Sequence, residues 1–261
     1  EADLQLLAQT MKVHPDLAGM ITRVSPCTRH GEGKLLRERV ARLYNRAIFH
    51  WRGKIHENIS PRNPDEAIRY FEAPLTFYHA GYTEEDVRKE KATRDLRLLQ
   101  ILLNEEGPDP YTFFQLGQCY AILGDKALAA NYYNQGLSMD PDPHLEYAPD
   151  MVEAYGYTLL DLKQYEKARS LEAYYDDFAV RADFFYLMGL IYMNNGRFPE
   201  AIAEFTKATQ TPVCSVEGVN DYSAKYNIGL IYEVTGNLPR AIQMYAACGD
   251  YAPAQAKLKK L

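Results

Sequence analysis

The 261-residue sequence lacks the features of membrane-spanning proteins, of secreted proteins and of proteins stabilised by structural zinc. No apolar run approaches the roughly 20 residues that a membrane-spanning helix needs, and the first residues, EADLQLLAQT, lack the basic and apolar regions of a signal peptide. The cysteines, at 27, 119, 214 and 248, are too scattered for a disulfide framework. Cys27 and His30 form an isolated C-x-x-H, and zinc needs three or four ligands. We therefore expect a cytoplasmic protein with reduced thiols and no metal site.

A basic surface is also missing from most of the chain. The net charge is -6, with 12 basic and 9 acidic residues in 1–82 but 17 basic and 26 acidic residues in 83–261. Binding to a nucleic acid requires cations that neutralise phosphates, so the acidic part argues against a nucleic-acid partner. The uneven distribution predicts two modules, and a hydrophobic content of 47% predicts that both are folded.

Four segments of the second module align with one another, near residues 110–143, 149–182, 182–215 and 222–255. Position 8 of the segments is always glycine, at Gly117, Gly156, Gly189 and Gly229. Position 20 is always alanine, at Ala129, Ala168, Ala201 and Ala241. Small residues at these positions let two antiparallel helices approach closely, and large residues at positions 4, 7, 11 and 24 fill the space between them. The segments resemble tetratricopeptide (TPR) repeats, which implies a mainly α fold: a right-handed solenoid of helical pairs.

The repeats depart from the family pattern in places that we expect the helical pairs to tolerate. Lys163 stands where a turn glycine is usual, and Gly136 replaces the usual alanine at position 27. Longer spacings predict irregular surface loops at HLEYA (144–148) and VCSVEGV (213–219). Residues 83–106 predict a leading helix that covers the first repeat, and residues 254–261 predict a short helix that closes the stack.

The first 82 residues predict a small strand-containing segment rather than repeat helices. A short helical pattern at 3–12 precedes extended stretches at 18–26, 39–45, 47–59 and 67–79. In the stretch 47–59, AIFHWRGKIHENI, alternation along one strand gives one mostly apolar face that includes Glu57. The other face is basic, with His50, Arg52, Lys54, His56 and Asn58.

Ordered motifs in this segment resemble the C-terminal edge of bacterial family 2 glycosyltransferases that continue into TPR repeats. The matching residues are Arg42, Leu43, Gly53, His56, Glu57, His79, Gly81, Tyr82, Lys91 and Arg94. The resemblance implies that 1–82 is the remnant of a nucleotide-sugar-binding GT-A domain and 83–261 its TPR solenoid. The full enzyme would then be an inverting, nucleotide-sugar-dependent glycosyltransferase. The rival interpretation is a non-enzymatic TPR scaffold for protein–protein interactions.

The glycosyltransferase resemblance places His56 and Glu57 at an active-site edge and makes Arg52 and Lys54 candidates for binding the sugar diphosphate. From periodicity alone, the same residues are solvated charges on an exposed strand. The only Asp-x-Asp, at 140–142, falls in a turn after a repeat helix. A divalent metal and a nucleotide sugar are therefore expected only with the family's N-terminal half, and this chain alone is expected to be inactive.

The first helix of each TPR pair lines a concave groove, which gives a second candidate site. The groove residues are Tyr111, Phe114, Gln118, Glu153, Tyr157, Tyr186, Asn194, Tyr226 and Glu233. Aromatic rings with acidic rims suit a basic-aromatic peptide, a partner protein or an acceptor glycan. The alternative is that these tyrosines fill contacts between helices.

Overall fold

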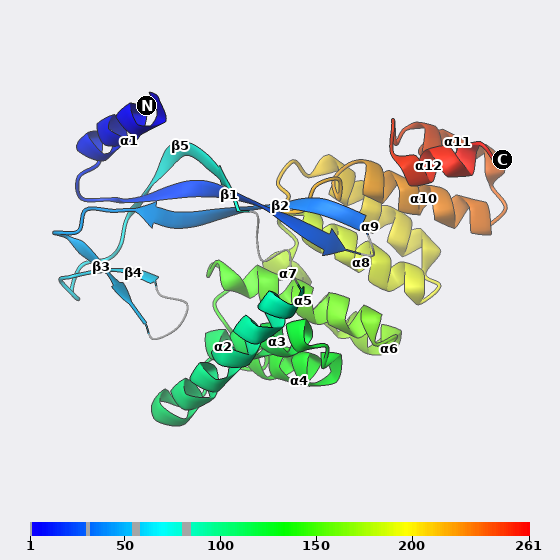
Figure 1. The fold of residues 1–261 in the computed structure, drawn as a ribbon. Coiled ribbons are helices and arrows are strands. Elements are labelled where there is room, and N and C mark those ends of the chain that lie inside the picture. The colour runs from blue at the N-terminus through cyan, green and yellow to red at the C-terminus, as the bar shows by residue number, and fades with distance from the viewer. Residues whose placement is uncertain (1, 30–31, 54–57, 80–84) are drawn as a thin grey trace. The chain divides into compact units, whose positions relative to one another are not determined.

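A computed structural model describes residues 2–29, 32–53, 58–79 and 85–261 of the chain. These residues form two compact units, Glu1–Glu85 and Asp86–Leu261 (Figure 1). The first unit contains the strands and the second contains the repeats.

The first unit begins with helix α1 (Ala2–Val13) and continues into two small sheets. Its strands are β1 (Ala18–Arg29), β2 (Glu32–Leu43), β3 (Phe49–Arg52), β4 (Asn58–Pro61) and β5 (Tyr70–Tyr78). The larger sheet has the order β2-β1-β5, with β1 antiparallel to β2 and parallel to β5. Strands β3 and β4 form a separate antiparallel pair.

Close packing at the start of β1 holds the larger sheet together. A Cβ atom at Gly19 would lie 2.7 Å from the ring of Phe71 and 2.9 Å from Cβ of Leu43, so only glycine fits between the two neighbouring strands. A buried group formed by Ala18, Phe49 and Ile59 joins β1 to the β3–β4 pair. In the larger sheet, four further apolar side chains are buried: Met20, Val24, Phe71 and Ala73.

The prediction of one strand over 47–59 is wrong. The chain instead makes a hairpin, in which Trp51 of β3 pairs with Ile59 of β4 and Arg52 pairs with Asn58. Gly53 ends β3 with a φ of 118°, a conformation that residues with a Cβ atom rarely adopt. His50, Arg52 and Asn58 still share one face of this hairpin, because Arg52 is paired with Asn58. Lys54 and His56, the other members of the predicted basic face, lie outside the described residues.

In its described part the second unit holds eleven α-helices and one 3-10 helix. They are α2 (Glu85–Glu106), α3 (Pro110–Leu123), α4 (Lys126–Leu137), α5 (Tyr147–Asp161), α6 (Tyr165–Ala168), η1 (Arg169–Tyr174), α7 (Tyr175–Phe178), α8 (Ala182–Asn194), α9 (Phe198–Gln210), α10 (Tyr222–Val234), α11 (Leu238–Ala246) and α12 (Ala252–Leu258). Helix pairs α3/α4, α8/α9 and α10/α11 pack along their lengths. The mainly helical repeat array preceded by a strand-containing segment is confirmed.

Contact between a glycine and an aromatic ring fixes three of the helical pairs. A Cβ atom at Gly117 would lie 2.4 Å from the Tyr133 ring, a distance that no real Cβ atom tolerates. The corresponding distances are 2.6 Å for Gly189 and Phe205 and 2.5 Å for Gly229 and Tyr245. The position-8 glycines therefore let the position-24 ring lie directly on the backbone of the first helix.

In the second repeat, leucine side chains rather than an aromatic ring pack on the position-8 glycine. Its position 24 is Glu172, and the space beside Gly156 is filled by Leu187 of the next repeat and by Leu171, whose Cδ2 atoms would lie 2.7 and 2.8 Å from an added Cβ atom. The second helix of this repeat is broken into α6, η1 and α7. A 3-10 helix has three residues per turn, so Leu171 lies on the same side as the buried Ala168, three residues before it. In an unbroken α-helix, the residue on that side would be four positions after Ala168, at position 24. The departures in this repeat are thus larger than the sequence predicts.

Lys163 adopts the left-handed conformation that glycine adopts in the other repeats. Its φ is 57°, compared with 90° for Gly124, 73° for Gly196 and 80° for Gly236, which end the first helices of the other pairs. The side chain of Lys163 is exposed. The turn therefore forms at a conformational cost to a residue that has a Cβ atom.

Replacing Lys163 with glycine should stabilise the array. Relief of the left-handed strain, about 1–2 kcal/mol, exceeds the entropic cost of a new glycine, about 0.5–1 kcal/mol. We expect Lys163→Gly to raise the free energy of unfolding in urea by about 0.5–1 kcal/mol. Gly124→Ala is the matched control and should lower it, and a loss of stability in Lys163→Gly would contradict the explanation.

Candidate functional site

Most of the predicted active-site edge in the first unit falls outside the described residues. Lys54, His56 and Glu57 belong to the segment 54–57, of which nothing is described. Arg52 is exposed at the end of β3, and His79 is exposed after β5. The structure therefore leaves the roles predicted for these residues untested.

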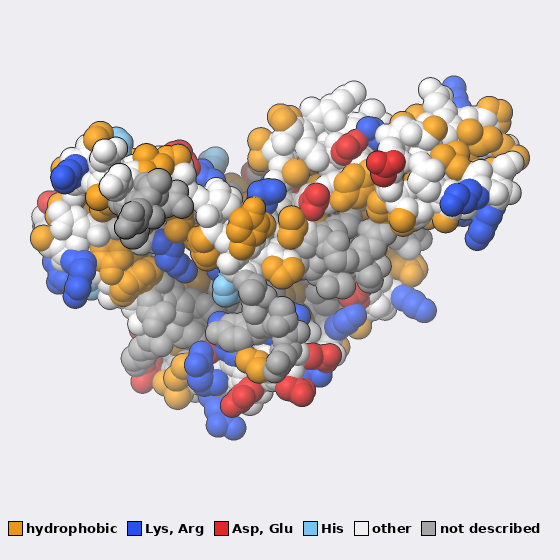
Figure 2. Space-filling model, turned by 45° about the horizontal axis from the view of Figure 1, so that its top comes forward, with side chains coloured by type: hydrophobic (Ala, Val, Ile, Leu, Met, Phe, Trp, Pro, Cys, Tyr) orange, Lys and Arg blue, Asp and Glu red, His pale blue; other side chains and the backbone are white. Residues whose placement is uncertain are grey.

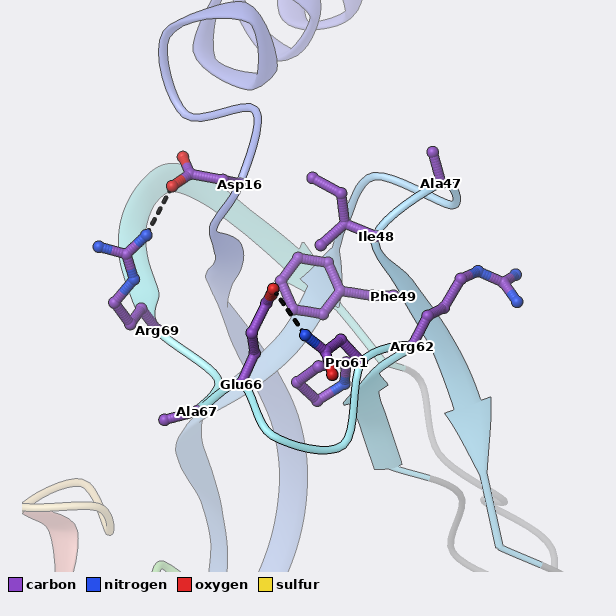
Figure 3. Close-up of a pocket in the computed structure, with 10 residues that line it drawn as sticks. Asp16, Ala47, Ile48, Phe49, Pro61, Arg62, Glu66, Ala67 and Arg69 are labelled. Carbon is purple, nitrogen blue, oxygen red and sulfur yellow. Dashed lines mark hydrogen bonds and ion pairs between the residues drawn. The ribbon is translucent and has the colours of Figure 1, made fainter.

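A hollow of about 730 Å³ opens elsewhere in the first unit, between the start of β1, the β3–β4 hairpin and the segment 62–69. Figure 3 shows the Phe49 ring beside Glu66, with Asp16 and Arg69 paired on one side. The Arg69–Asp16 distance is 2.6 Å, and Asn63 Nδ2 donates to Glu66 Oε1 at 3.1 Å. No sequence motif marks this hollow, because its residues come from separate segments. Its charged side chains have partners inside the protein: Asp16 and Arg69 pair with each other, Glu66 accepts from Asn63, and Arg62 donates to the Arg46 carbonyl.

The residues predicted to line the groove of the second unit differ in exposure. Phe114, Glu153 and Tyr186 are buried. The half-buried residues are Tyr111, Gln118, Tyr157, Tyr226 and Glu233, and Asn194 is exposed. A ligand on this surface would reach the half-buried and exposed residues and little of the buried ones.

Two of the predicted groove tyrosines also join neighbouring helices. The Tyr186 hydroxyl accepts a hydrogen bond from Asn227 Nδ2 at 3.0 Å, across the boundary between the third and fourth repeats. The Tyr226 ring lies 5.6 Å from Tyr245 and 5.5 Å from Tyr251. These tyrosines therefore contribute to packing whether or not a ligand binds.

The acidic side chains of the groove already have partners inside the protein. Arg181 Nη2 lies 2.8 Å from Glu153 Oε1 and 2.6 Å from Asp150 Oδ1. Burial lowers the pKa of the Arg181 guanidinium, but the carboxylates of Glu153 and Asp150 raise it more, so the net shift is upward. The Arg181 cation is therefore permanently charged, and it neutralises much of the acidic rim that the sequence predicts.

The same site holds the long loop between the third and fourth repeats. The Asp183 carboxylate accepts hydrogen bonds from the backbone N–H groups of Ser215, at 2.7 Å, and Val216, at 2.9 Å. Val216 and Val219 are buried. The prediction of an irregular surface loop is wrong for these residues, because two valines and an internal carboxylate fasten the loop to the start of α8.

Glu233 ties the last repeat to helix α12. Its Oε2 accepts a hydrogen bond from the Tyr245 hydroxyl and lies 2.9 Å from Lys257 Nζ, which also donates to Oε1 at 3.0 Å. The Tyr245 hydrogen bond, followed by that of Lys257, lowers the pKa of the Glu233 carboxyl. Glu233 is therefore a charged tie between α10, α11 and α12.

The two buried cysteines are unreactive, and the described residues hold no cluster of metal ligands. Burial, the largest cause, raises the pKa of Cys119 and of Cys248 to about 11, so both are thiols at neutral pH. No group of three or more His, Cys, Asp or Glu in the described residues is arranged to hold a metal ion. His30 lies outside the described residues, so the isolated C-x-x-H is not tested. Among the described helices, none combines the length and apolarity needed to cross a lipid bilayer.

Comparison with known protein families decides the nature of the helical unit. The tetratricopeptide-repeat family matches residues 110–143, 154–213 and 186–254. The helical unit is a TPR array. No curated protein matches the chain.

Solved TPR structures share this fold. MamA from Desulfovibrio magneticus RS-1 is 21% identical, with a TM-score of 0.51, over 69% of this chain and 98% of that chain. Another crystal structure of MamA is 19% identical, with a TM-score of 0.54, over 69% of this chain and 99% of that chain. YrrB, described as a TPR protein with an unusual peptide-binding site, is 20% identical, with a TM-score of 0.54, over 68% of this chain and 89% of that chain. At these identities the similarity shows the fold alone.

Removing Arg181 should destabilise the TPR array strongly. Arg181→Met leaves the buried carboxylate of Glu153 without this cation, which costs about 3–5 kcal/mol. Lys126→Met is the matched control, because Lys126 pairs with Asp161 at an exposed site, where a pair contributes about 1 kcal/mol or less. Urea denaturation should show the difference, and adding Glu153→Gln should recover part of the loss. Equal effects of the two single substitutions would contradict this account.

The tie at Glu233 should make the end of the TPR array sensitive to acid. Because the pKa of folded Glu233 is lowered, its contribution is complete above the unfolded-state pKa, about 4.3. It is lost as the pH falls through the lower pKa of the folded state. We expect Glu233→Gln to reduce the loss of thermal stability on acidification, with the exposed Glu217→Gln as control. An unchanged pH dependence in Glu233→Gln would exclude the tie as a source of it.

Proposed function

We propose that the TPR array is a protein-interaction scaffold whose first helices, α3, α5, α8 and α10, bind an extended segment of a partner protein. The observation that carries this proposal is the array itself. Stacked helical pairs, fixed by glycine–aromatic contacts, create the extended concave surface that repeat proteins use for binding. YrrB, which shares the fold, is described as having a peptide-binding site, and this description supports a similar use here.

The accessible groove residues favour a particular ligand chemistry. Tyr111, Tyr157 and Tyr226 offer half-buried rings, and Gln118 and Asn194 offer amide groups beside them. Rings of this kind stack on apolar, aromatic and guanidinium groups, and side-chain amides bond an extended backbone. Because the nearby carboxylates are paired with Arg181 and Lys257, the aromatic rings rather than net charge would supply most of the affinity.

A C-terminal carboxylate is not the ligand that this groove favours. Position 5 of the four repeats is Phe114, Glu153, Tyr186 and Tyr226, with no lysine or asparagine to clamp a carboxylate. An internal peptide segment with aromatic and basic side chains fits the residues better. A glycan whose sugar faces stack on the tyrosines is the alternative occupant.

Obstruction of the groove tests the proposal without disturbing the core. Gln118→Arg combined with Asn194→Arg places bulk at one half-buried and one exposed position. We expect the double variant to weaken binding of a fluorescent extended peptide of alternating Tyr and Arg by about tenfold or more. Val180→Arg, at a site 67% exposed outside the first helices, is the control. Tyr186→Ala is less informative, because Tyr186 is buried and bonded to Asn227.

An affinity for this peptide that is equal in the wild type, the double variant and the control would exclude the groove as the binding surface. Absence of binding in the wild type would exclude this ligand chemistry. Binding of an oligosaccharide that the double variant loses would favour the glycan alternative.

The glycosyltransferase interpretation rests only on the order of motifs between Arg42 and Arg94. The family matches lie within residues 110–254, and none of the comparisons supports glycosyl transfer. If the interpretation held, the TPR groove would bind the acceptor or a partner of the enzyme. A longer reading frame with an Asp-x-Asp motif after a hydrophobic strand upstream of Glu1 would favour it.

A further inference from the structure

In the first and third repeats, one side of the second helix is covered by the repeat that follows. In the first repeat, Ala130 at position 21 is buried, and Asn134 at position 25 accepts a hydrogen bond from the Tyr155 hydroxyl of α5 at 3.1 Å. In the third repeat, Ile202 at position 21 is half-buried, and α9 packs on α10. Positions 21 and 25 therefore face the first helix of the next repeat.

The fourth repeat leaves this side of its second helix open. Leu238 is 45% exposed, Ile242 is 41% exposed, and Ala246 is exposed. These residues are four apart, so they form one line along α11, which we call the terminal stripe. Helix α12 occupies the place of a following helix, but it has only seven residues and buries only Ala254 fully. It packs beside Tyr245 and Cys248 and does not cover the stripe.

Basic side chains follow α12. Lys259 and Lys260 are exposed there, whereas Arg240 points away from the stripe, with its guanidinium over the Tyr232 ring of α10. The ion pair between Lys257 and Glu233 places the end of α12 beside the turn between α10 and α11, near the start of the stripe. At the C-terminal end of the array, on the right in Figure 2, hydrophobic side chains are grouped with Lys and Arg side chains beside them.

We infer that the terminal stripe is a second docking surface, separate from the groove, which takes an amphipathic helix of a partner protein. The occupant is a helix because, within this chain, the equivalent side of α4 is covered by the helix α5. Its apolar residues are spaced three and four apart to meet Leu238 and Ile242. Acidic residues flank its apolar face, because Lys259 and Lys260 are exposed at the end of α12, which the Lys257–Glu233 pair holds near the start of the stripe.

A designed helix provides the probe. It is a stapled peptide of four turns, about 14 residues, with leucines along one face and glutamates on both flanks. We expect it to bind the 261-residue chain, and Leu238→Glu with Ile242→Glu to weaken that binding by about tenfold or more. Val213→Glu, at an apolar site 63% exposed elsewhere in the array, should leave it unchanged. Circular dichroism checks that each variant keeps its helix content.

The remaining outcomes overturn the inference. Equal binding of the same peptide with lysines in place of glutamates excludes an acidic partner. A dimer in light scattering that disappears in the double variant identifies a second copy of the chain as the occupant. Co-sedimentation with anionic phosphatidylserine vesicles, lost in the double variant while the peptide fails to bind, identifies a membrane surface instead.

Discussion

The contact of an aromatic ring with a glycine backbone is the interaction on which the helical unit depends. Gly117, Gly189 and Gly229 each allow a ring from the second helix to lie where a Cβ atom would otherwise be. The short distance between the two helices aligns the remaining side chains, including the alanines at position 20, all of which are buried. Each pair alone exposes an apolar face, so the pairs gain most of their stability by stacking.

Charged side chains join successive repeats to one another. Arg181 connects α5 to the start of α8, and the neighbouring Asp183 connects α8 to the loop before α10. Buried groups of this kind contribute little net stability when satisfied, but they are costly when a partner is missing. They therefore specify one arrangement of successive repeats, and they also explain why few carboxylates in the groove are available to a ligand.

The regular part of the fold could be predicted from the sequence because it depends on spacing. The glycines at position 8 and the alanines at position 20 recur at fixed distances, and they identify each helical pair without further information. The broken second helix of the second repeat could not be predicted in this way, because Ala168 keeps the expected alanine at position 20. The difference is that Leu171, rather than the residue at position 24, packs beside Gly156. The hairpin at 49–61 was missed because alternation along a single strand and across a hairpin gives similar patterns, and Gly53 was the only local signal of a reversal.

The 3-10 segment of the second repeat also bears on how the array opens. Hydrogen bonds in a 3-10 helix have poorer geometry than those of an α-helix, so the backbone of η1 is held less strongly than that of the α-helices around it. Leu171 and Ala168 nevertheless remain buried, which means that opening there uncovers the core between α5 and α8. The second repeat is therefore held by the side chains that it buries more than by regular backbone hydrogen bonds in its second helix.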